Sequence, residues 1–180
     1  MGAVINSRIT NCYATCSVSG IGEGFLASRI GGIAGEITGS IGNVGIATNC
    51  YATGAVSGNN EVGGIAGCIP SSGSITNCAA LNISITRTGG SSTTQFGRVA
   101  GCLYENPTLT NNVAYSGMTV LGNTVTTGTA TNINGADMDK ATIQAGGTLG
   151  NRFTAANGWT VENGKLPGFG AAVELPEHLQ

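Results

Sequence analysis

The chain has 180 residues, of which 9% are charged, 41% are hydrophobic and 31 are glycine. The apolar fraction excludes a disordered polar linker, and a net charge of −2 with seven scattered basic residues argues against nucleic-acid binding, which needs clustered Lys and Arg. No apolar run approaches the roughly 18 residues of a membrane span. The start lacks the basic and apolar segments of a signal peptide, so we expect a piece of a longer exported protein.

A motif near the start of the chain recurs three times. It occupies residues 9–20 as ITNCYATCSVSG and returns over residues 47–58 as ATNCYATGAVSG. Shorter copies begin at residue 75 as ITNCAA and at residue 109 as LTNNVA. The motif asparagines are 38, 28 and 34 residues apart, which indicates degenerate repeats.

A glycine-rich block lies between these copies. It reads IGGIAG over residues 30–35, VGGIAG over 62–67 and FGRVAG over 96–101. Glycine permits the sharp corners and positive φ angles that other residues resist. Because the two motifs alternate in the same order, the prediction is one repeated structural unit.

The asparagine motif has the alternation of a β-strand, with Cys12 and Ala14 on one face and Asn11 and Tyr13 on the other. One face is small and apolar, so each repeat buries only a thin stripe and needs neighbours on both sides. We therefore predict an all-β parallel β-solenoid. Stacked repeats would align two internal columns, one of Cys12, Cys50 and Cys78 and one of Ile33, Ile65 and Val99.

The combination of the two motifs resembles the GLUG-motif repeat family over roughly residues 5–120. The third copy lacks the tyrosine, and Asn112 replaces the cysteine in the fourth. The resemblance implies a right-handed parallel β-helix in a bacterial surface or secreted protein. It carries over no catalytic residue, because the family motif contains none.

The repeat pattern ends near residue 132, so residues 1–132 form the predicted repeat domain. Residues 133–170 are predicted to cap it, with Asp137 at the start of a helix over 138–145 and two strands between residues 153 and 166. Trp159 and Phe169 would cover the last repeat. Residues 171–180 are predicted to be a flexible tail.

The six cysteines admit two interpretations. Cys12, Cys50 and Cys78 are expected to be small buried hydrophobes. Cys68 and Cys102 each follow an Ala-Gly step 34 residues apart, and a disulfide between them stands as an alternative to free thiols. No C-x-x-C pair occurs, so no metal site is expected.

No catalytic residue or cofactor is predicted. The single histidine, His178, lies three residues from the end, where we expect it to be solvated. Glu23 and Glu61 were the acids to consider for a glycosidase pair, since they follow equivalent Ser-Gly steps. Tyr13 and Tyr51 are expected to stack outward on neighbouring repeats, either simply protecting the sheet face or forming an aromatic ladder able to bind sugar rings or a protein.

The expected function is therefore a non-catalytic adhesive or structural module of a bacterial surface or secreted protein, located outside the cell or on its surface. The alternative is a carbohydrate-binding or carbohydrate-active β-helix acting on polysaccharide. Expected partners are glycans, host or cell-surface proteins and other domains of a longer parent chain.

Overall fold

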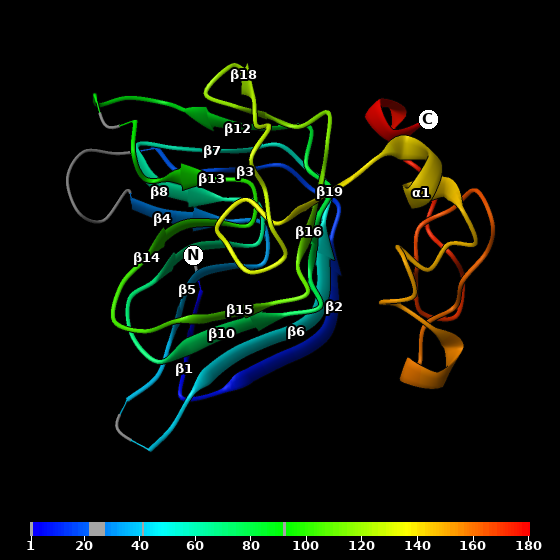
Figure 1. Ribbon diagram of the computed structural model, residues 1–180, viewed down its shortest axis with the longest axis horizontal. Coiled ribbons are helices and arrows are strands. Elements are labelled where there is room, and N and C mark those ends of the chain that lie inside the picture. The colour runs from blue at the N-terminus through cyan, green and yellow to red at the C-terminus, as the bar shows by residue number, and fades with distance from the viewer. Residues whose placement is uncertain (1, 22–27, 41, 92) are drawn as a thin grey trace. The chain divides into compact units, whose positions relative to one another are not determined.

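The computed structural model describes residues 2–21, 28–40, 42–91 and 93–180. It divides into two compact units, Met1–Asp137 and Met138–Gln180. The described residues are largely β, with little helix, which confirms the predicted class (Figure 1).

Within the described residues, strands of the repeats assemble into four sheets. The first sheet contains β1 (Ala3–Ile5), β5 (Ala34–Thr38), β9 (Ala66–Ile69) and β14 (Ala100–Leu103), in that order. The second contains β2 (Arg8–Ala14), β6 (Gly45–Ala52), β10 (Gly73–Thr76), β11 (Ala79–Ala80), β15 (Thr108–Thr110), β16 (Val113–Tyr115) and β19 (Ala136–Met138). The third contains β3 (Val18–Ser19), β7 (Val56–Gly58), β12 (Ser84–Arg87), β17 (Thr119–Val120) and β18 (Asn123–Thr124). The fourth contains β4 (Ser28–Gly31), β8 (Asn60–Gly63) and β13 (Phe96–Gly97).

Strands from successive repeats pair in parallel, so equivalent residues of the motifs lie side by side. Tyr13 pairs with Tyr51 across β2 and β6, and Phe96 pairs with Val62 across β13 and β8. The β17–β18 hairpin, in contrast, is antiparallel. Equivalent strands of successive repeats pair in this way although the asparagine motifs are 38, 28 and 34 residues apart, because the segments between paired strands can differ in length.

The two predicted columns follow from this register. Ile33 and Ile65 each donate a backbone hydrogen bond to the next member of their column, Ile65 and Val99 respectively, and Val99 donates to Ile133. Cys50 and Cys78 are fully buried. Cys12 was expected to be buried but is exposed, because its strand β2 lies at the edge of the sheet and has a neighbour on one side only.

The motif asparagines mark a bend in the second sheet. Asn11, Asn49, Asn77 and Asn111 all have positive φ, between 52° and 55°. Asparagine tolerates this left-handed conformation better than most residues because its short polar side chain bonds locally. β2 and β6 curve along their length, whereas the later copies break into two strands at this asparagine (Figure 1).

Amide side chains link these bends from one repeat to the next. Asn49 donates through Nδ2 to Asn11 Oδ1 at 3.2 Å, and Asn111 donates to Asn77 Oδ1 at 2.7 Å. The motif therefore requires asparagine for two reasons, the backbone conformation and the contact with the neighbouring copy.

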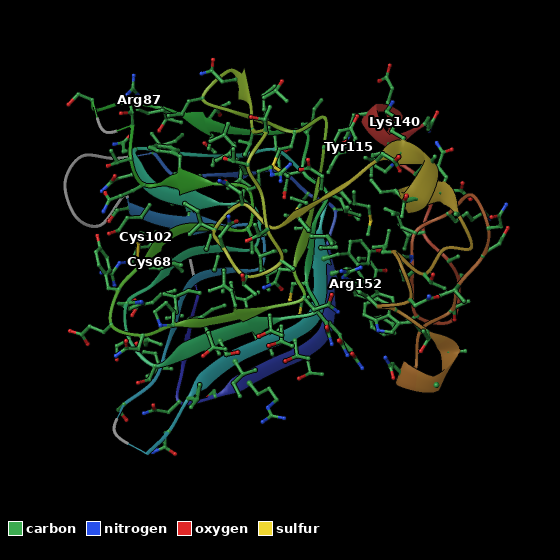
Figure 2. The ribbon with its side chains drawn as sticks, viewed as in Figure 1. Cys68, Arg87, Cys102, Tyr115, Lys140 and Arg152 are labelled. Carbon is green, nitrogen blue, oxygen red and sulfur yellow. A yellow bond between two sulfur atoms is a disulfide. The ribbon has the colours of Figure 1, made fainter. Side chains whose placement is uncertain are left out.

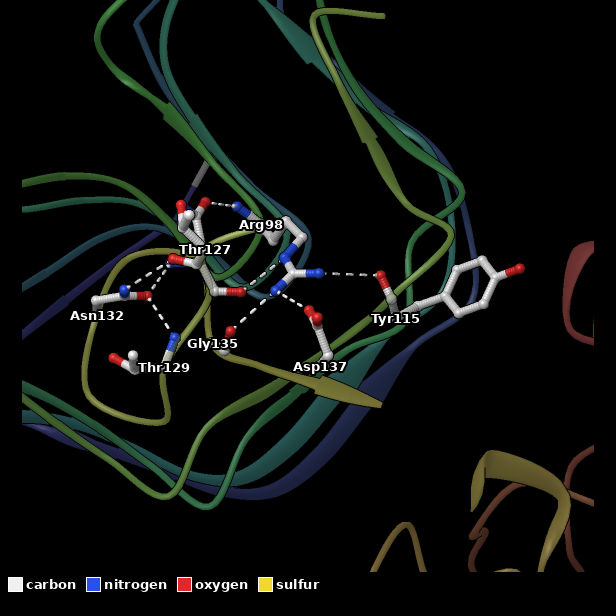
Figure 3. A network of polar contacts seen from close by, with 8 residues as sticks. Arg98, Tyr115, Thr127, Thr129, Asn132, Gly135 and Asp137 are labelled. Atoms are coloured by element: carbon white, nitrogen blue, oxygen red, sulfur yellow. Dashed lines mark hydrogen bonds and ion pairs between the residues drawn. The ribbon is translucent and has the colours of Figure 1, made fainter. Parts of the chain in front are cut away.

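Arg98 ends the series of glycine blocks. Arg98 replaces the second glycine of the motif, which is Gly64 in the preceding copy. A Cβ atom added to Gly64 would lie only 2.3 Å from the carbonyl oxygen of Arg98, so the preceding copy has no room for a side chain there. The buried Arg98 guanidinium instead donates to the carbonyls of Asn134 and Gly135, both at 2.9 Å, and pairs with Asp137 at 2.6 Å (Figure 3). Arg98 thus holds residues 134–137, which follow the last repeat, against the glycine block.

The second unit contains a short helix, α1 (Lys140–Gln144), and two 3-10 turns, η2 (Ala155–Asn157) and η3 (Glu177–Leu179). The cap of α1 is Asp139, whose Oδ1 accepts from the Thr142 amide at 2.8 Å, and not Asp137 as predicted. Asp137 is instead the partner of Arg98.

The two strands predicted between residues 153 and 166 are replaced by η2 and by isolated antiparallel bridges. Gly158 has a φ of 85° and ends η2, so its turn follows a 3-10 helix rather than joining two strands. Trp159 is buried between Phe153, at 4.9 Å edge to face, and Phe169, stacked at 4.3 Å. Phe153 and Trp159 are thus buried in the second unit, whereas Phe169 is an exposed ring stacked on Trp159.

The segment predicted to be a flexible tail makes specific contacts. Val173 forms a bridge with Leu166, and Leu179 in η3 is fully buried. The carbonyl of Leu179 also accepts from Gln144 Nε2 at 2.8 Å. The apolar side chains of Val173 and Leu179 supply this packing.

Candidate functional site

Chemically reactive residues flank each glycine block. Each block carries a strand of the fourth sheet into a strand of the first, from β4 to β5, from β8 to β9 and from β13 to β14. The flanking positions are seven residues apart, and they hold the pairs Arg29 and Glu36, Glu61 and Cys68, and Gln95 and Cys102. We call these six residues the flanking cluster.

The parallel register brings the three pairs together. It aligns Arg29 of β4 with Glu61 of β8, and it pairs Glu36 of β5 directly with Cys68 of β9. Cys68 in turn pairs with Cys102 of β14. Residues from three different repeats thereby occupy one small region.

Arg29 connects the two carboxylates of the cluster. Its Nη1 donates to Glu36 Oε2 at 2.5 Å, and its Nε donates to Glu61 Oε2 at 2.9 Å. The Glu61 side chain is 7% exposed, against 23% for Glu36. Burial lowers the pKa of Arg29, but the hydrogen bonds and charges of Glu36 and Glu61 together raise that pKa above its ordinary value.

Cys68 and Cys102 are joined by a disulfide, with their Cα atoms 4.7 Å apart (Figure 2). Both cysteines are buried. One carboxylate oxygen of Glu61 and the two sulfur atoms all lie within 4.8 Å of one another. A buried carboxylate therefore lies close to a buried cystine and also pairs with Arg29.

A small cavity adjoins the cystine. It has a volume of about 310 Å³, and Cys102, Gln95 and Tyr104 contribute to its lining. Gln95 Nε2 donates to the Tyr104 hydroxyl at 2.5 Å across the same region. Cys102 therefore borders a space large enough for several water molecules.

The two tyrosines proposed as a binding ladder do stack, with ring centroids 5.2 Å apart and planes inclined by 5°. Tyr51 is nevertheless fully buried, whereas Tyr13 is 36% exposed. Strand β6 has neighbours on both sides, β2 and β11, while β2 is an edge strand. Burial, reinforced by the nearby Tyr13, raises the pKa of Tyr51. The expected exposed ladder thus reduces to the single ring of Tyr13.

A larger cavity of about 650 Å³ lies beside the β17–β18 hairpin. Val120 and Leu121 supply apolar surface, and Thr86, Arg87 and Asn123 supply polar groups. Its volume falls in the range of small-molecule sites, and the mixture of aliphatic and hydrogen-bonding groups suits a hydroxylated ligand.

The remaining sequence candidates do not gather into a site. Glu23 lies outside the described residues. Its supposed equivalent, Glu61, instead shares its register position with Arg29. His178 lies within the 3-10 turn η3 of the second unit.

Comparison with known protein families, curated proteins and solved structures finds no match to this chain. No helix among the described residues is both long and apolar enough to span a membrane.

Sequence reasoning paired Cys68 with Cys102 but missed the flanking cluster, because it did not connect these cysteines with Arg29, Glu36 and Glu61. The signal was present in the regular spacing, since a polar or sulfur-containing residue precedes and follows all three glycine blocks. The contact between Arg29 and Glu36 could not be predicted from the sequence, because it depends on the path of the glycine block, which brings its two flanking residues together.

Proposed function

We propose that the repeats form a right-handed parallel β-helix of the GLUG type, and that the chain is a non-catalytic adhesive or structural module of a bacterial surface or secreted protein. The carrying observation is the parallel, in-register pairing of equivalent residues from successive repeats in four sheets. The first three repeats contribute a strand or strand pair to all four sheets and the last repeat to three of them, which makes an extended surface supported by a continuous core.

The buried disulfide supports an extracellular location. Structural disulfides persist in oxidising compartments and are rare in the bacterial cytosol. The bridge between Cys68 and Cys102 links two successive repeats, so it opposes their separation as a crosslink in a mechanical support would.

A carbohydrate-active β-helix is the second candidate function, and one observation favours it. Glu36 and Glu61 both accept hydrogen bonds from the guanidinium of Arg29, so two carboxylates, the groups that a glycosidase uses, lie near one another. Both are engaged by Arg29, however, and Glu61 is nearly inaccessible to substrate. These contacts favour a structural role for the acids, and the cavity near Arg87 is the better place for a sugar to bind without reaction.

A panel of polysaccharides, scored for retention of the protein and for release of reducing ends, tests both candidates. We expect retention without release, and Arg87→Ala to weaken retention while Glu36→Gln leaves it unchanged. Release of reducing ends that disappears in Glu36→Gln and Glu61→Gln would overturn the non-catalytic proposal. Absence of both signals would reject glycan adhesion and leave mechanical support as the function.

A further inference from the structure

When its disulfide is reduced, the cystine of the flanking cluster supplies two thiols next to the Glu61 carboxylate, a combination of groups that can bind a metal ion. Two sulfur atoms and one carboxylate oxygen lie within 4.8 Å of one another. Thiolate sulfur and carboxylate oxygen are both ligands of Zn²⁺, at about 2.3 Å and about 2.0–2.2 Å respectively. The three donors therefore need only small movements to surround one ion.

The backbone already holds the two thiols at a suitable spacing. Cys68 and Cys102 are directly paired residues on parallel neighbouring strands, with Cα atoms 4.7 Å apart. After reduction, two sulfur atoms on such neighbours remain on the same side of the sheet. Their separation then suits two corners of a tetrahedron around a zinc ion.

Arg29 orients the third donor. It binds Glu61 through Oε2 and is itself fixed by Glu36. Carboxylate ligands of metal ions are commonly held by such outer hydrogen bonds, which fix their direction. The fourth coordination position can be taken by solvent, because Cys102 also lines the cavity of about 310 Å³.

We propose that Cys68, Cys102 and Glu61 form a redox-gated site for a thiophilic divalent cation, with Zn²⁺ as the best match. In the oxidised protein the S–S bond occupies both sulfur atoms and the site is closed. A small-molecule dithiol opens it by thiol–disulfide exchange, giving two protons and two electrons to the cysteines and becoming a disulfide itself. A phosphine opens it together with one water molecule, which supplies both protons, and becomes a phosphine oxide. Zn²⁺ then binds both sulfurs and releases those two protons. This site goes beyond the proposed structural function and does not depend on it.

The test compares one protein in two redox states, so that no substitution is needed for the first result. The full chain is reduced with a phosphine, freed of reductant without oxygen, and titrated with Zn²⁺ by calorimetry and with Co²⁺ by visible absorption. We expect one equivalent of tight binding with a thiolate-to-Co²⁺ charge-transfer band, and no such band in the oxidised protein. Equal behaviour of the two states, whether both bind or neither binds, would overturn the proposal.

Substitutions then locate the ion. Cys68→Ser and Cys102→Ser should each abolish the charge-transfer band, and Glu61→Gln should weaken Zn²⁺ binding by at least about 10-fold. Cys50→Ser is the matched control, because it removes a buried thiol of the other cysteine column and should leave binding unchanged. Binding that survives in Cys68→Ser and Cys102→Ser but is lost in Cys50→Ser would assign the ion to the wrong column and refute the site.

Discussion

At the residue scale, departures from the repeat motif have structural roles. Asn112, which stands where earlier copies have cysteine, is fully buried. It accepts from the Cys78 amide at 3.0 Å and donates to the Ile75 carbonyl at 2.8 Å. Arg98 likewise replaces a glycine and bonds three carbonyls. Residues that look like decay of the repeat therefore satisfy backbone groups near its last copies.

Replacing Arg98 with alanine should destabilise the protein by about 3 kcal/mol, because it leaves the buried carbonyl of Gly135 and the half-buried carbonyl of Asn134 without this donor. Urea unfolding measures this change. Arg87→Ala is the control, because Arg87 is exposed and its loss should change stability by less than about 0.5 kcal/mol. Equal effects of the two substitutions would contradict the role given to Arg98.

A second prediction concerns Asn49, which has a φ of 52° and bonds Asn11. Asn49→Ala should cost about 1–2 kcal/mol, since alanine loses the amide contact and resists the left-handed conformation. Asn49→Gly loses the same contact but tolerates the backbone, so it should cost about 1 kcal/mol less than alanine. Thermal unfolding of the two variants compares them, and a glycine variant no more stable than the alanine variant would count against backbone strain.

At the element scale, the glycine block separates strands of two sheets, and the asparagine bend divides a strand in the two later copies. Sequence periodicity was sufficient to predict a largely β chain with parallel strands, because alternation and repetition are local signals. It could not show that each block returns Arg29 to Glu36, since that depends on the path of the chain between strands. In the second unit, where no repeat guides the interpretation, a predicted pair of strands proved to be a 3-10 turn with isolated bridges.

Helix α1 gives a prediction on pH dependence. The hydrogen bonds that Asp139 accepts from Thr142, first from its side chain and then from its amide, lower the pKa of the Asp139 carboxyl. A lowered pKa in the folded state means that ionised Asp139 stabilises the cap at pH values above the ordinary pKa of about 3.9. That contribution is lost as the pH falls through the lower folded pKa.

The amide resonance of Thr142 in NMR spectra reports this titration. We expect its midpoint below pH 3.9 in the native protein, and no titration at this amide in Asp139→Asn. A midpoint at or above the ordinary value would show that the cap does not hold the ionised carboxylate.

At the scale of the whole molecule, the repeats are stabilised by contacts between successive copies, which together form one continuous core. The buried side chains are mostly small and aliphatic, and they run from copy to copy. The disulfide adds a covalent link between residues 34 positions apart.

Chain-entropy reasoning for a loop of this length predicts that Cys102→Ser lowers the unfolding free energy by about 3–4 kcal/mol under oxidising conditions. Under reducing conditions the variant and the parent should differ by much less, as measured by denaturant unfolding in both buffers.

The measurement that tests the parallel register most directly is disulfide mapping after mild oxidation, by digestion without reductant and mass spectrometry. The register places Cys68 opposite Cys102, so the account predicts a peptide pair linked through these two residues. It also predicts that the buried Cys78 is recovered as a free thiol. Free Cys68 and Cys102 after oxidation, or a link from either of them to Cys78, would contradict the pairing of the repeats on which the fold, the flanking cluster and the proposed functions all rest.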